Sequence, residues 1–192
     1  MRTATTRRVA SLATMERTTT RGRSRAGVAR EAASSTRATG SEVRVEDLFP
    51  EGERRGIILY DGVCNLCNGA VNFAIANDGN GGQGGSVRFA ALQSETGRRL
   101  LRNAGRDAED ISSIVFVEAA NSEASYVKSE AVLRIAKRMR APFPQLAAIG
   151  SVFPRALGDL AYDLVADNRY FILGRRDECR LGDDVHDDRF LR

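Results

Sequence analysis

The chain has 192 residues, of which 42% are hydrophobic, enough for one folded domain with an extension. Its net charge of +4 is uneven, because residues 1–40 carry nine Arg and two Glu whereas residues 41–192 carry 20 basic and 23 acidic residues. The acidic body lacks the basic surface of a nucleic-acid-binding protein, and three cysteines are too few for a disulfide-stapled secreted domain. No apolar run reaches the roughly 18 residues of a membrane helix, so we expect no membrane span.

Residues 1–40 have the composition of a targeting segment. They contain nine Arg, nine Thr, eight Ala and four Ser, but no Lys, Asp or aromatic residue, and they cannot form a core. Abundant Arg and hydroxyl residues with few acids are typical of organelle transit peptides. We predict a disordered transit peptide, cleaved between Arg25 and Gly40, that directs the protein to the chloroplast or, as the alternative, the mitochondrion. A basic tail that stays attached is the other interpretation.

A polar lead-in segment, residues 41–55, precedes the expected folded domain of residues 56–192. Residues 57–60 are apolar and predict a buried strand, which the sequence D-G-V-C-N-L-C (residues 61–67) follows. An apolar stripe after Cys64 predicts a helix that ends near Gly79. Cys64 therefore falls at the start of this helix, and Cys67 lies one turn further along.

The pattern continues with short strands and amphipathic helices. We expect a strand over residues 87–90, a helix from a Ser94 cap to Asn103, and a hairpin of strands 114–117 and 125–128. A helix capped by Ser129 and a buried segment at 142–154 should follow. The next helix would start at Pro154, and its predicted buried residues are Leu157, Leu160, Ala161, Leu164 and Val165.

Residues 174–192 form a charged tail that carries Cys179 and His186. The order of elements predicts an α/β fold of the thioredoxin type, with a βαβ unit, a β-hairpin and C-terminal helices. A C-x-x-C sequence near such a βαβ pattern is itself a redox signal.

The spacing of Cys64 and Cys67 suits dithiol chemistry. Residues three apart on a helix have Cβ atoms about 5–6 Å apart, so a disulfide can open and close there with little backbone movement. A helix N-terminus favours a thiolate, which makes Cys64 the expected nucleophile and Cys67 the thiol that resolves a mixed disulfide. Two alternatives remain: buried structural cysteines, or a zinc site completed by Cys179 and His186.

Two other residues have open roles. Asp61 lies three residues before Cys64 and either accepts a proton from Cys67 or orients the turn; it equally fits an Asx turn that satisfies backbone amides. Cys179 is either a third redox thiol or a small buried hydrophobic residue.

The D-x-x-C-x-x-C sequence of residues 61–67 resembles the signature of the DCC family of thiol-disulfide oxidoreductases. Three further segments resemble that family in the right order: residues 89–94, residues 129–133, and the closing segment with Asn168, Arg169, Tyr170, Gly174 and Cys179. The resemblance runs from about Ile57 to Leu181. It implies a thioredoxin-like fold and catalytic Cys64 and Cys67. Many thioredoxin-like proteins have a proline before the third strand, but residues 110–114 here contain none.

The resemblance therefore implies a thiol-disulfide oxidoreductase of the protein-disulfide reductase type. Its partners would be a disulfide-containing protein or small-molecule substrate and an external thiol reductant, with no bound cofactor and no nucleic acid. The alternative is a non-catalytic thioredoxin-like interaction module or a cysteine-based metal-binding protein.

Overall fold

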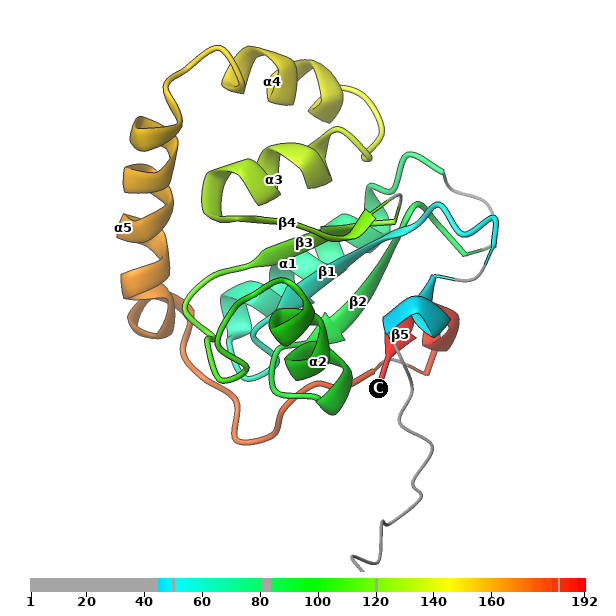
Figure 1. Cartoon of the computed structure of the whole chain (residues 1–192). Helices are drawn as coiled ribbons and strands as arrows, with labels where there is room; N and C mark the ends of the chain where they lie inside the picture. The colour runs from blue at the N-terminus through cyan, green and yellow to red at the C-terminus, as the bar shows by residue number, and fades with distance from the viewer. Residues whose placement is uncertain (1–44, 50, 81–83, 120, 183) are drawn as a thin grey trace, which may run out of the picture. The chain divides into compact units, whose positions relative to one another are not determined.

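The computed structural model describes residues 45–49, 51–80, 84–119, 121–182 and 184–192, and Figure 1 shows their arrangement. The transit peptide predicted for residues 1–40 lies outside these residues and stays a prediction. The strands are β1 (Gly56–Tyr60), β2 (Val87–Ala91), β3 (Val115–Glu118), β4 (Asn121–Val127) and β5 (Phe190–Leu191). The α-helices are α1 (Asn65–Ala76), α2 (Glu95–Asn103), α3 (Lys128–Ala136), α4 (Phe143–Gly150) and α5 (Arg155–Leu173). Two 3-10 helices are η1 (Val45–Leu48) and η2 (Asp187–Arg189).

One mixed sheet organises the domain, with strand order β4-β3-β1-β2-β5. Strand β1 pairs in parallel with β2 across helix α1, and it pairs antiparallel with β3, which forms a hairpin with β4. The expected α/β, thioredoxin-like class with a βαβ unit and a hairpin is therefore confirmed. Strand β5 was not predicted; it adds the end of the charged tail to the sheet, parallel to β2.

Helices cover both faces of the sheet (Figure 1). Ile58 and Tyr60 of β1 pack with α1 and α3 on one face, whereas Ile57 and Leu59 pack with α2 and η1 on the other. This alternation is the two-residue period of a strand that is buried on both sides. Strand β1 is thus the centre of both cores, and its carboxyl end delivers the chain to Cys64.

The helix caps differ in how well sequence indicated them. Ser94 caps α2 as predicted, accepting a hydrogen bond of 3.0 Å from the Gly97 amide. The prediction that Ser129 caps the third helix is wrong, since Val127 is the N-cap and the Ser129 hydroxyl donates to Asp159 of α5. Ser129 is used instead to fasten one helix to another.

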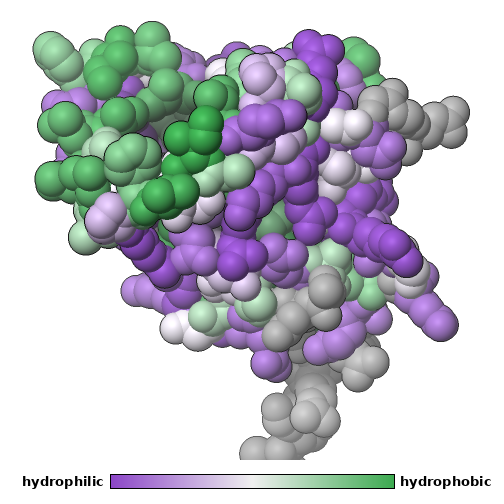
Figure 2. Space-filling model, turned by 90° about the horizontal axis from the view of Figure 1, so that it is seen from above, coloured by the Kyte–Doolittle hydropathy of each residue, from purple (hydrophilic) through white to green (hydrophobic). Residues whose placement is uncertain are grey.

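The burial predicted for the C-terminal helices is wrong. Segment 142–154 forms α4 and an exposed turn, in which Val152 is 82% exposed. All five residues predicted to be the buried face of the last helix are exposed, Leu160 by 67%. Helix α5 packs through the opposite face, where Tyr162, Arg169 and Tyr170 are partly buried. Figure 2 shows the resulting gathering of apolar residues on one side of the molecule.

The tail from α5 to the end of the chain crosses the carboxyl end of β1. We call residues 174–182 the strap. Helix α5 holds the strap on one side, and on the other the buried ion pair of Arg189 with Asp78 and strand β5 anchor the chain. No helix of the described residues is long and apolar enough to cross a membrane.

Candidate functional site

The two cysteines lie where β1 ends and α1 begins. Cys64 is the N-cap residue of α1, and its Sγ accepts a hydrogen bond of 3.2 Å from the Cys67 backbone amide. Both thiols are free in the structure. One of the free amides at the N-terminus of α1 is therefore directed at Sγ of Cys64, at the end of the helix where negatively charged groups are favoured in general.

The two thiols differ in exposure. Cys64 is fully buried, at 0% exposure, whereas Cys67 is half-buried. Burial raises the pKa of Cys67 strongly, and a hydrogen bond between the Cys67 and Cys64 side chains raises it further. Cys67 is therefore a protonated thiol at neutral pH. The sulfur of Cys64 accepts the hydrogen bond from the Cys67 backbone amide.

The strap covers Cys64. Arg175 pairs with Cys64 in an isolated antiparallel bridge. The Arg176 amide donates to the Val63 carbonyl at 2.8 Å, and the Arg180 amide donates to the Gly62 carbonyl at 3.0 Å. Backbone hydrogen bonds thus hold the strap across the turn that precedes α1.

Asp61 is 3% exposed and connects three parts of the chain. Its Oδ1 accepts the Val63 amide at 3.1 Å, which is the predicted Asx turn, and also the Gln93 side-chain amide at 2.7 Å. Its Oδ2 accepts the Tyr170 hydroxyl and lies 3.6 Å from Arg169 Nη2. Burial and the neighbouring Asp61 carboxylate raise the pKa of Tyr170, so this hydroxyl stays protonated and donates.

The segment before β3, which contains no proline, is held by α5. Arg169 donates to the carbonyls of Ile111 and Ser112, each at 3.2 Å. The amide of Ile114 donates to the Tyr162 hydroxyl at 2.8 Å. Side chains of α5 therefore satisfy backbone groups of this segment, next to the dithiol turn.

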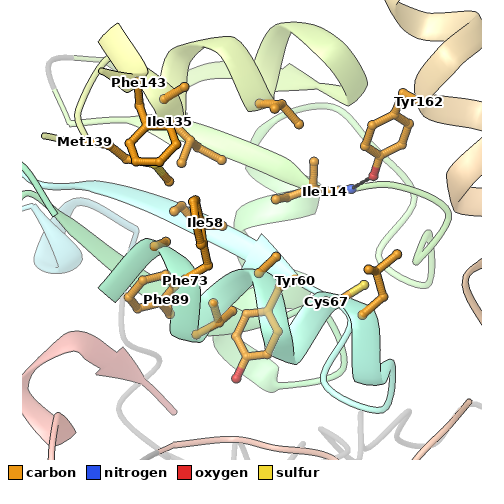
Figure 3. A pocket seen from close by; sticks show the side chains of 16 residues that line it. Ile58, Tyr60, Cys67, Phe73, Phe89, Ile114, Ile135, Met139, Phe143 and Tyr162 are labelled. Carbon is orange, nitrogen blue, oxygen red and sulfur yellow. Dashed lines mark hydrogen bonds between the residues drawn. The ribbon is translucent and has the colours of Figure 1, made fainter. Parts of the chain in front are cut away.

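A cavity of about 340 Å³ opens beside Cys67, between α1, α3 and the sheet (Figure 3). Apolar side chains line almost all of it, with Cys67, Ile114 and Tyr162 at one end and Phe73, Met139 and Phe143 at the other. The rings of Phe73 and Phe143 meet edge to face, with centroids 5.2 Å apart, and so connect α1 with α4.

Comparison with known proteins identifies the family. Residues 58–175 match the DCC1-like thiol-disulfide oxidoreductase family, which covers more than half of the chain. This protein belongs to the DCC1-like thiol-disulfide oxidoreductase family. A chloroplastic DCC family protein of Arabidopsis thaliana is 49% identical over 139 residues, which cover 72% of this chain and 77% of the relative. The uncharacterised protein YuxK of Bacillus subtilis (strain 168) is 38% identical over 135 residues, covering 70% of this chain and 93% of YuxK.

No solved structure matches the chain. Membership of the DCC1-like family supports a thiol-disulfide oxidoreductase role, and the chloroplastic name of the plant relative suggests a plastid location.

The metal-binding alternative receives no support from the geometry of this DCC1-like domain. Among the residues that the structure describes, no group of three or more His, Cys, Asp or Glu side chains is placed to hold a metal ion. Cys179 lies instead at the Gly62 turn, where its Sγ is 3.6 Å from Gln93 Oε1, and burial raises its pKa.

Sequence reasoning missed the residues that support the dithiol from a distance. Arg169 and Tyr170 entered only through their resemblance to the DCC family, and Gln93 only as part of a matching segment. Tyr162 gave no signal, because a tyrosine in an amphipathic helix usually packs in a core. The strap could not be placed, since a charged tail without periodicity predicts no contact.

Proposed function

We propose that this protein is a thiol-disulfide oxidoreductase of the protein-disulfide reductase type, which acts through the Cys64–Cys67 dithiol. The observation that carries the proposal is the hydrogen bond from the Cys67 amide to Sγ of Cys64 at the first turn of α1. It combines two features that suit dithiol exchange: a sulfur that accepts an amide at a helix N-terminus and a second thiol within one helical turn.

The reaction would proceed in two exchanges. The Cys64 thiolate attacks one sulfur of the substrate disulfide, forming a mixed disulfide and releasing the other substrate sulfur, which takes up a proton. Cys67 then loses its proton and attacks Sγ of Cys64, which breaks the mixed disulfide and releases the second substrate thiol. The substrate gains two electrons and two protons, and an external thiol reductant restores the Cys64–Cys67 dithiol.

Asp61 would act as a positioning residue in this scheme. Both of its oxygens already accept hydrogen bonds, from Val63 and Gln93 at Oδ1 and from Tyr170 at Oδ2. These contacts favour the orienting role over direct acceptance of the Cys67 proton. The carboxylate would hold the turn that presents Cys64, and its charge would add to the pKa elevation of Cys67.

The strap would control access to the nucleophile. Because Cys64 is fully buried and the strap is bonded to the backbone of the turn before it, the first exchange would require the strap to lift from the Val63 carbonyl. We further propose that the protein acts in the chloroplast after cleavage of the transit peptide between Arg25 and Gly40, in keeping with the chloroplastic plant relative.

The test is a redox titration of the full chain across thiol-disulfide buffers, with reduced thiols trapped by a mass tag. We expect a single two-electron transition that is lost in Cys64→Ser and in Cys67→Ser and kept in Cys179→Ser. The midpoint potential would show whether the pair acts as a reductant or an oxidant. A chain with no reversible transition would overturn the proposal.

A further inference from the structure

The cavity beside Cys67 is open to solvent at Phe73 and Val132, so it is a surface cleft that a ligand can enter and not a closed void in the packing. A volume of about 340 Å³ lies at the lower end of the range for small-molecule sites. The cavity therefore has the size of a binding site for a small ligand.

The chemistry of the lining restricts the ligand. Nearly every lining group is apolar; the Tyr162 hydroxyl accepts a hydrogen bond from the Ile114 amide, which leaves its single O–H to donate. A peptide in this cavity would bury most of its N–H and C=O groups without partners, at a high cost in free energy. An alkyl chain has no such groups, and its methylenes gain free energy on leaving water.

The position of Cys67 sets the orientation of the ligand. Figure 3 places the Cys67 sulfur at one end of the cavity, while Phe73 and Phe143 flank the opposite end. Phe73 of α1 and Val132 of α3 line the cavity and are 48% and 45% exposed, so they lie where the cavity meets solvent. A chain inserted between them would carry its sulfur end to the dithiol.

We propose that this cavity binds the alkyl chain of a small-molecule disulfide, whose sulfur atoms lie at the Cys67 end, one helical turn from Cys64, and are attacked by Cys64 when the strap lifts. This inference rests on the proposed function for the chemistry of the sulfur atoms. It names the substrate class, a disulfide carried on an unbranched alkyl chain, and it assigns Phe73, Val132 and Ile135 as residues that contact that chain.

The test uses alkyl methanethiosulfonates with methyl, butyl, hexyl and octyl chains on the full-length Cys64→Ser variant, in which no neighbouring thiol can resolve the adduct. The reagent transfers its alkylthio group to a cysteine thiolate and releases methanesulfinate. Mass spectrometry gives the rate at Cys67 relative to Cys179, which lies outside the cavity lining and serves as the internal control. We expect this ratio to rise roughly fourfold for each methylene that enters the cavity, from about 0.8 kcal/mol per buried methylene.

A matched pair of variants on α1 locates the effect. Ala70 and Ala76 are both exposed residues of this helix, but only Ala70 lines the cavity. Ala70→Leu should remove the dependence on chain length, whereas Ala76→Leu should keep it. A ratio that is flat or falls with chain length, or that responds equally to both substitutions, would overturn the assignment.

The two proposals fail in different ways. A rising ratio in a protein that shows no redox transition would retain the alkyl-binding cavity and overturn the oxidoreductase function. A normal redox transition with a flat ratio would retain the oxidoreductase and remove the cavity as its substrate site.

Discussion

The sulfur of Cys179 lies against the Cα of Gly62, so close that a Cβ atom added to Gly62 would stand 2.3 Å from Sγ. This contact joins the strap to the turn that presents the dithiol. It also explains why a glycine occupies the second position of the D-G-V-C sequence, since Arg180 backbone atoms lie within 3.3 Å of the same point.

Gly62→Ala is expected to displace the strap and to destabilise the fold by about 1–3 kcal/mol, the range for overpacked sites. The measurement is the free energy of unfolding in urea, together with the alkylation rate of Cys179, which should rise. Gly69→Ala is the control, because nothing lies within 4 Å of its added Cβ on α1 and the change should stabilise by about 0.5–1 kcal/mol. Equal stability of Gly62→Ala and wild type would contradict the packing described here.

Asp61→Asn should slow thiol-disulfide exchange while the protein stays folded. The substitution removes the charge that faces Tyr170 and Arg169, so the raised pKa of Tyr170 should fall toward its ordinary value. Ultraviolet titration of tyrosine and exchange kinetics across pH 6–9 provide the measurements. Tyr170→Phe keeps the carboxylate and should have the smaller kinetic effect; kinetics of Asp61→Asn equal to wild type at every pH would refute a role for Asp61.

Stability should decline in alkaline solution because of Cys67. Burial raises the Cys67 pKa in the folded protein, whereas the pKa of a cysteine thiol in the unfolded chain is about 8.5. The stabilisation is complete below that pH and is lost as the pH rises above it, by at most about 1.4 kcal/mol per pH unit for one thiol. Urea unfolding of the reduced protein at pH 8–10 should show a flatter decline for Cys67→Ala than for wild type. Parallel profiles would show that Cys67 does not contribute.

Arg180→Ala should make Cys64 more reactive. The Arg180 guanidinium donates to Asn72 Oδ1 at 2.8 Å and so ties the strap to α1. For an exposed contact, a loss of at most about 1 kcal/mol would raise the population of the lifted strap, and with it Cys64 alkylation, by up to roughly fivefold. Arg176→Ala is the matched control, since Arg176 holds the strap through its backbone amide. Equal rates of Cys64 alkylation in the two variants would show that the hydrogen bond from Arg180 to Asn72 does not hold the strap.

Sequence was sufficient for the parts of this structure that local pattern determines. The apolar run before Cys64, the Ser94 cap and the hairpin predicted from residues 114–117 and 125–128 all depend on neighbours in the chain or on a short turn. The dithiol position follows from the same local order of strand and helix.

Contacts between distant elements could not be predicted. The leucines of α5 follow a helical period and therefore indicated a buried face, yet that face is exposed in the described domain. Helix α5 packs instead through polar and aromatic residues, among them Tyr162, Arg169 and Tyr170. Their partners outside the helix lie at least 48 residues away, at the residue after β1 and in the segment before β3. A hydrophobic pattern shows which residues are apolar. It does not show which element will pack against a helix face that carries both polar and aromatic residues.

The strap is held at both ends, by α5 before it and by β5 after it. Exposure of Cys64 is therefore a local opening event within an otherwise native fold, of the kind that native-state hydrogen exchange measures. The backbone amides of Arg176 and Arg180 donate hydrogen bonds to Val63 and Gly62. As the temperature changes, their rate of hydrogen–deuterium exchange should change in parallel with the alkylation rate of Cys64. In this protein the alkylation rate of Cys64 would therefore measure how often the strap opens.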